Sequence, residues 1–96
     1  MAYTQLEQAP TPEGWRFTVT VAEGGGQTRH EVTLDHATYA RLTAGGVPPQ
    51  ALMQESFAFL LEREPKESIL RRFDLAVIGR YFPEYEGEIR RRLALQ

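Results

Sequence analysis

The chain contains no cysteine and only two histidines, His30 and His36. The missing cysteine excludes disulfides, thiolate nucleophiles and cysteine-ligated zinc. The two histidines are six residues apart, and this spacing matches no common metal-binding motif. We therefore expect the protein to use no metal, no cofactor and no redox chemistry, and we expect both histidines to have structural or surface roles.

Long hydrophobic runs are also missing, because no stretch approaches the ~20 apolar residues that span a membrane. The first residues carry neither a basic stretch nor an apolar core, so they do not resemble a secretory signal. A formal net charge of −2 provides no general attraction to nucleic-acid phosphates. We expect a cytoplasmic protein without a membrane partner, and the charge argues against nucleic acid as a partner.

Motifs of catalysis are not found either. Ser56 and Ser68 lie in helical patterns and not in the Gly-x-Ser-x-Gly turn that exposes a nucleophile. The glycines at residues 24–26 are not followed by the Lys-Ser/Thr pair of a phosphate-binding loop. The carboxylates within residues 62–67 alternate with basic residues, which is typical of a solvated helix junction. These observations predict that the chain is not an enzyme.

Alternating apolar residues predict two β-strands. Every second residue over 15–21 is apolar, which is the period of a half-buried strand. The glycine triplet at 24–26 then supplies the backbone freedom that a tight turn needs. The alternation returns over residues 29–34, with His30 on the apolar side. The pattern predicts an antiparallel β-hairpin with one apolar face.

Helical periodicity predicts a series of helical segments after the hairpin. Asp35 is a suitable N-cap for the first of them. Proline at the start of a helix and glycine after its end mark the other boundaries. Helical segments are predicted over residues 36–43, over residues 50–63, from Pro65 through Phe73, over residues 75–82, and from Pro83 through Leu93.

Together these features predict one α+β domain over residues 14–96. It consists of an N-terminal antiparallel β-hairpin followed by about four helices that pack on the apolar face of the hairpin. The chain is long enough for one hydrophobic core. Residues 1–13 are predicted to form a polar tail, with a short extra strand around residues 3–6 as the alternative.

The order of elements over residues 29–64 resembles a ribbon-helix-helix protein. The resemblance rests on a strand, a capped helix containing Thr-Tyr-Ala-Arg-Leu at 38–42, a glycine turn and a longer helix over 50–62. In that family two chains pair their strands into a ribbon that enters the DNA major groove. The resemblance therefore implies a dimeric DNA-binding regulator. Its implied nucleic-acid contacts are the outward side chains of the strand, Arg29, Glu31 and Thr33.

The C-terminal half is similar to a family of small uncharacterised bacterial proteins. The similarity is carried by the blocks at residues 57–70, 73–75 and 81–85. It implies a small bacterial protein and assigns no activity, ligand or site.

A complete core pattern without a catalytic constellation favours a non-enzymatic protein-interaction module. Its partner is an unknown protein or a second copy of the chain, which would form a homodimer. The aromatic residues could serve as core or as interface, and the basic run of residues 90–92 either complements its helix dipole or contacts a partner. The candidate partner surface consists of Trp15, Tyr81, Tyr85, Arg90 and Arg91. The alternative function is the ribbon-helix-helix regulator.

Overall fold

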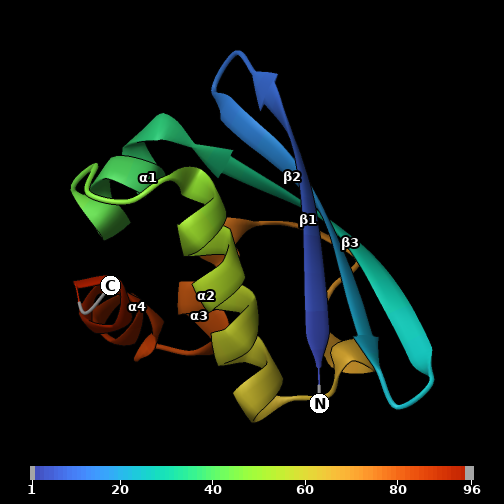
Figure 1. Cartoon of the computed structure of the whole chain (residues 1–96). Coiled ribbons are helices and arrows are strands. Elements are labelled where there is room, and N and C mark those ends of the chain that lie inside the picture. Colours follow the sequence, from blue (N-terminus) through green and yellow to red (C-terminus); the bar gives the residue numbers. More distant parts are fainter. Residues whose placement is uncertain (1, 95–96) are drawn as a thin grey trace.

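A four-stranded sheet forms one layer of the protein, and the helices lie along one side of it (Figure 1). The structure is a computed structural model that describes residues 2–94. The strands are β1 (Tyr3–Thr11), β2 (Gly14–Glu23), β3 (Gly26–Asp35) and β4 (Arg72–Asp74). The α-helices are α1 (His36–Thr43), α2 (Pro49–Arg63), α3 (Ile78–Tyr81) and α4 (Tyr85–Ala94), and two 3-10 turns are η1 (Lys66–Ser68) and η2 (Leu75–Val77). The predicted α+β class is confirmed.

The strand order is β1-β2-β3-β4, with the first three strands antiparallel and β4 parallel to β3. The predicted hairpin is formed by β2 and β3. Glu23 pairs with Gly26, so Gly24 and Gly25 alone form the turn. Their φ angles are 63° and 84°, a region that glycine adopts without a steric penalty and that matches the twist of a two-residue hairpin turn.

The hairpin is only part of the sheet, because the predicted tail is a strand. Residues 3–11 form β1, which pairs with β2 from Tyr3 opposite Ala22 to Thr11 opposite Gly14. The tail prediction was therefore wrong over these residues, while Met1 lies outside the described part of the chain. A polar strand with a proline is compatible with the edge of a sheet, where one row of backbone groups faces solvent.

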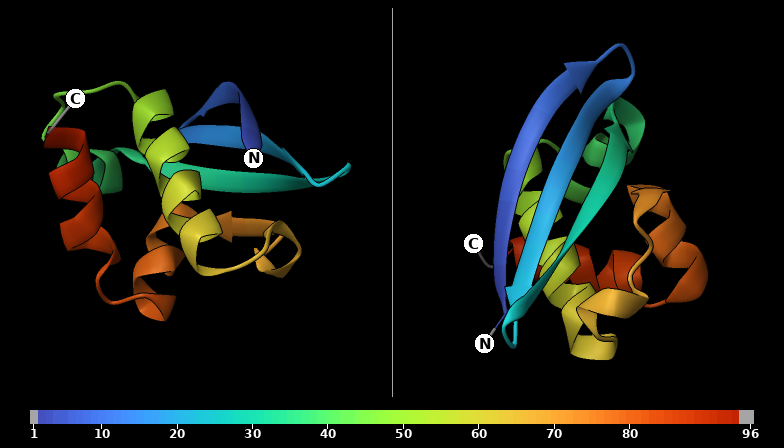
Figure 2. Two further views of the ribbon diagram at one scale, coloured as in Figure 1. Left: turned by 60° about the horizontal axis from the view of Figure 1, so that its bottom comes forward. Right: turned by 90° about the vertical axis from the view of Figure 1, so that its right-hand side faces the viewer.

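The core lies between the sheet and the helices, which occupy the same side in two further views (Figure 2). The inward residues of β2 and β3 are those that the alternation predicts, and His30 is buried with them. The Phe57 ring of α2 lies 5.5 Å from the His30 ring. The other helical and loop residues in the core are Leu42, Leu52, Met53, Phe59, Leu60, Ile69, Leu75, Ile78, Tyr85, Ile89 and Leu93.

The first two helices begin and end close to the predicted residues. The Asp35 side chain accepts a hydrogen bond from the Thr38 backbone N–H at 2.7 Å, which confirms the N-cap of α1. Ala44, and not a glycine, is the C-cap of α1, with φ 53°. The long helix α2 begins at Pro49, one residue before the predicted start.

The helix predicted from Pro65 through Phe73 was wrong. This segment forms η1 and then β4, because β3 offers it an edge to pair with. The Glu31 backbone N–H donates to the Arg71 carbonyl at 2.8 Å, and the Thr33 hydroxyl donates to the Asp74 carboxylate at 2.8 Å. Over the described residues, no helix has both the length and the apolar character needed to cross a membrane.

Candidate apolar binding pocket

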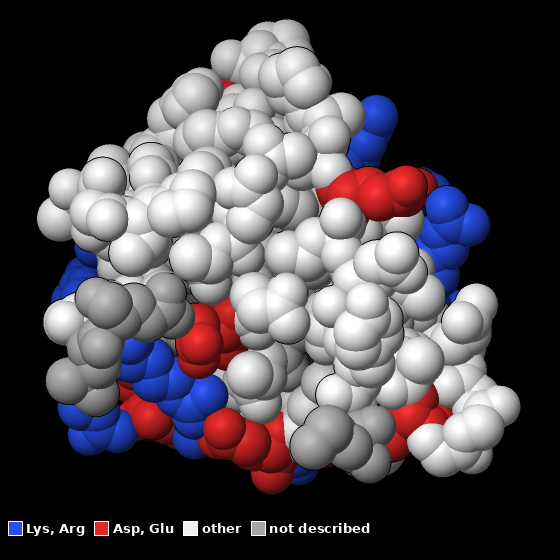
Figure 3. All heavy atoms as spheres, viewed as in Figure 1, with Lys and Arg blue, Asp and Glu red and all other residues white. Residues whose placement is uncertain are grey.

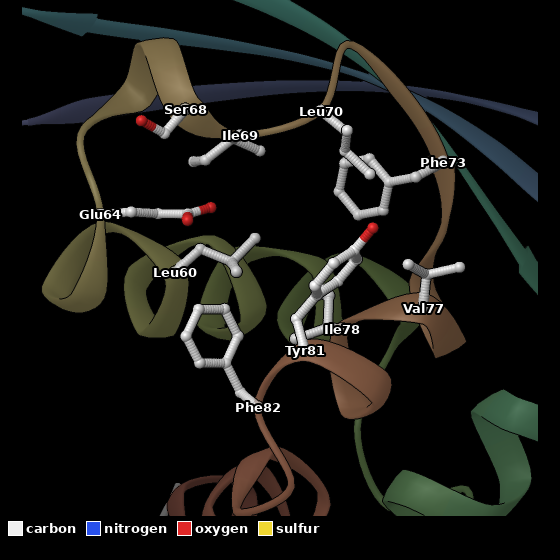
Figure 4. Close-up of a pocket in the computed structure, with 10 residues that line it drawn as sticks. All are labelled: Leu60, Glu64, Ser68, Ile69, Leu70, Phe73, Val77, Ile78, Tyr81 and Phe82. Carbon is white, nitrogen blue, oxygen red and sulfur yellow. The ribbon is translucent and has the colours of Figure 1, made fainter.

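An apolar pocket of about 270 Å³ opens between the end of α2, the segment from η1 to β4, and α3 (Figure 4). Leu70 and Tyr81 stand at this pocket and are 46% and 66% exposed. Only one other large apolar side chain among residues 2–94, Tyr3, is as exposed. The complete lining is Leu60, Glu64, Ser68, Ile69, Leu70, Phe73, Val77, Ile78, Tyr81 and Phe82.

His30 holds the backbone of the pocket wall from inside the core. Its Nδ1 lies 2.8 Å from the Leu70 carbonyl oxygen. A carbonyl only accepts, so Nδ1 carries the proton, and Nε2 of the neutral ring accepts from the Thr28 hydroxyl at 2.8 Å. Burial lowers the pKa of His30, which keeps the ring neutral. The histidine therefore has the structural role expected from the sequence.

Glu64 is the charged side chain of the pocket, and its carboxylate points into the cavity in Figure 4. The residue is the C-cap of α2, and its backbone has an extended conformation with φ −152° and ψ 155°. Pro65 follows and disfavours a helical residue before it. Within residues 2–94 the Glu64 carboxylate has no hydrogen-bond or ion-pair partner. The pocket therefore combines an apolar lining with an unpaired anion.

The arginines at 90–92 are engaged within the chain and do not form a free basic face. Arg90 donates to the Arg41 carbonyl at 3.3 Å, and Arg91 pairs with Glu88. Arg92 lies 2.6 Å from the Glu62 carboxylate, and this hydrogen bond lowers the pKa of Glu62. Figure 3 shows positive and negative side chains mixed where α4 lies, at the lower left.

The two tyrosines proposed as a partner surface have opposite environments. Tyr81 is exposed at the pocket, but Tyr85 is fully buried, so the assignment of Tyr85 to a surface was wrong. The Tyr85 hydroxyl is 2.6 Å from the Ser56 hydroxyl oxygen. Burial raises the pKa of Tyr85. Trp15 is half-buried, and its ring contacts the Tyr39 ring edge-on at a centroid distance of 5.1 Å.

The three residues implied as nucleic-acid contacts lie on the side of β3 that faces away from the core. Glu31 pairs with Arg72 at 3.4 Å, Thr33 is bonded to Asp74, and Arg29 is exposed. β3 pairs with β2 along one edge and with β4 along the other. The pairing with β4 spans only residues 31–33, and over these residues β3 lacks the free edge with which ribbon-helix-helix chains form their ribbon.

No family model, no curated protein and no solved structure matches this chain. Across residues 2–94, no group of three or more metal-ligating side chains is close enough to hold an ion. The pocket has an apolar lining and one carboxylate, and the Ser68 hydroxyl points away from the cavity in Figure 4. This arrangement suits the burial of one apolar group beside a negative charge.

Of the pocket residues, the sequence named only Tyr81 as a candidate partner contact. The apolar residues around it have the spacing of ordinary helical core residues, so the sequence did not distinguish them from the core. Leu70 was expected in a helix, but it lies between η1 and β4, where its side chain is left outside the core.

Proposed function

We propose that this protein is a non-enzymatic interaction module that binds one apolar side chain of a partner protein in the pocket. The observation that carries the proposal is the exposure of Leu70 and Tyr81 next to an open apolar cavity. Large exposed apolar side chains that cluster at a concave site are typical of binding surfaces.

The size of the pocket favours a protein side chain over a cofactor. Sites for small molecules usually have volumes of about 300–1,000 Å³ and several converging polar groups. This pocket has about 270 Å³ and a mainly apolar lining. A single aromatic or aliphatic anchor that fills a pocket is the usual centre of a protein interface.

The ribbon-helix-helix alternative stays a prediction that no contact described above favours. Its strand has both edges occupied over residues 31–33, and the arginines at 90–92 are held by carboxylates or backbone. A partner protein accounts for the exposed apolar residues, which DNA would leave in water.

The proposal is tested by titrating the ¹⁵N-labelled protein with the neutral peptide acetyl-Gly-Trp-Gly-amide and recording amide shifts. We expect the shifts to concentrate at residues 69–70 and 77–82. Leu70→Asp and Tyr81→Ala should abolish them, because the first places a charge at the pocket and the second removes its wall.

Tyr3→Ala is the matched control, because Tyr3 is 65% exposed and Tyr81 is 66% exposed, while Tyr3 lies on β1 and outside this pocket. This variant should bind the peptide as the unmodified protein does. Shifts spread evenly over the surface, or an equal loss of binding in Tyr3→Ala, would overturn the proposal.

A further inference from the structure

Glu64 differs from the other carboxylates at the ends of its helix and of α4. Glu62, Glu84, Glu86 and Glu88 each have an arginine within hydrogen-bond distance. Glu64 has no such partner among residues 2–94, although it is only partly exposed and its carboxylate points into an apolar cavity. The arginines Arg71 and Arg72 line a separate hollow with Arg29 and Glu31. The pocket therefore contains a negative charge that the chain itself does not neutralise.

The position of this charge determines which apolar groups can enter. A side chain that fills the pocket removes water from the Glu64 carboxylate, and an anion that loses water without gaining a partner is destabilised. A cation carried next to the apolar group restores the lost interactions through a charge-assisted hydrogen bond. A second anion would add repulsion, so the carboxylate also excludes acidic ligands.

We propose that the pocket selects a partner segment in which an apolar anchor residue stands next to a lysine or arginine, whose cation pairs with Glu64. This inference rests on the proposed function, because it specifies the chemistry of the same partner. The apolar anchor supplies the buried area, and the cation supplies the specificity.

The test compares three peptides that differ at one residue: acetyl-Gly-Trp-Lys-Gly-amide and its Gln and Glu counterparts. Their dissociation constants are measured from amide shifts at neutral pH and low salt. We expect the Lys peptide to bind most tightly and the Glu peptide most weakly. The affinity of the Lys peptide should exceed that of the Gln peptide by about threefold to fivefold, the range of a partly exposed ion pair.

Glu64→Gln should make the three affinities equal while the tryptophan still binds. Glu7→Gln is the control, since Glu7 is an exposed carboxylate on β1 at the opposite edge of the sheet. This variant should keep the full preference for lysine. Added salt should weaken the preference for lysine in the unmodified protein and leave the peptide affinities of the variant Glu64→Gln unchanged.

The possible failures separate the two proposals. Equal binding of the three peptides by the unmodified protein would overturn the charge selection and leave the interaction pocket standing. A preference for lysine that persists in Glu64→Gln would also overturn it, because the cation would be recognised elsewhere. Tighter binding of tryptamine than of the Lys peptide would show that the occupant is a small amine. Binding of none of these probes would overturn the proposed function itself.

Discussion

Removing the Ser56 hydroxyl should destabilise the protein more than removing the Tyr85 hydroxyl, although the two groups bond to each other. Both side chains are fully buried. The Ser56 hydroxyl donates to the Leu52 carbonyl at 2.7 Å, so its oxygen accepts the proton of Tyr85 at 2.6 Å. Ser56 thus links α2 to α4 as both donor and acceptor.

The two substitutions leave different groups without a partner. Ser56→Ala leaves the Tyr85 hydroxyl as a buried donor without an acceptor, which costs about 1–3 kcal/mol of unfolding free energy. Tyr85→Phe removes that donor and leaves Ser56 bonded to Leu52, so it costs about 0.5–1.5 kcal/mol. The double variant has no buried hydroxyl that lacks an acceptor. Its loss should be smaller than the sum of the single losses by about 1 kcal/mol.

Urea denaturation followed by far-UV circular dichroism measures these free energies. The slope of the unfolding free energy against urea should be the same in all four proteins. Additive losses in the double variant, or a larger loss for Tyr85→Phe than for Ser56→Ala, would refute the assigned direction of the hydrogen bond.

Two further predictions concern His30 and Gly14. Burial lowers the pKa of His30 from its ordinary 6.5, so the unfolded chain binds the proton more tightly than the folded protein does. The stabilisation of the folded state is therefore complete above pH 6.5. It is lost as the pH falls from there through the folded-state pKa. Urea denaturation should show that the unfolding free energy declines between pH 8 and pH 5. The variant His36→Gln should keep this decline, since His36 is exposed, and His30→Gln should reduce it. Equal declines in the two variants would refute the role of His30. A Cβ on Gly14 would lie 2.2 Å from the Leu34 carbonyl oxygen, so Gly14→Ala should lower the unfolding free energy by about 1–3 kcal/mol. Gly87→Ala is its control, because a Cβ there meets open space in α4 and should stabilise the helix by up to about 1 kcal/mol; similar effects of the two changes would contradict the steric argument.

The sequence predicted those elements whose signals are local. The alternation over β2 and β3 depends on residues two apart, and the Asp35 cap of α1 lies next to the helix that it starts. β4 has only three residues and forms by parallel pairing with a strand some 40 positions earlier. Its residues also fit a helical spacing, and only the free edge of β3 made a strand the better choice.

The pocket depends on tertiary packing even more strongly. Tyr81 and Tyr85 are four residues apart, yet the first lies at the end of α3 and is exposed, while the second begins α4 and is buried. Their composition and spacing are equally consistent with either arrangement. Glu64 looked like part of a solvated charge cluster, and only the closure of the segment from η1 to β4 over the end of α2 places it at a cavity.

Whether the pocket takes up a partner side chain is tested most directly by locating a bound side chain in it by NMR. Intermolecular nuclear Overhauser effects would be measured between the indole protons of acetyl-Gly-Trp-Lys-Gly-amide and the methyl groups of the protein. We expect contacts to Leu60, Ile69 and Ile78, which line the cavity. Contacts only to methyl groups outside this lining, such as that of Leu61 near Tyr3, or no contacts at saturating peptide, would contradict it.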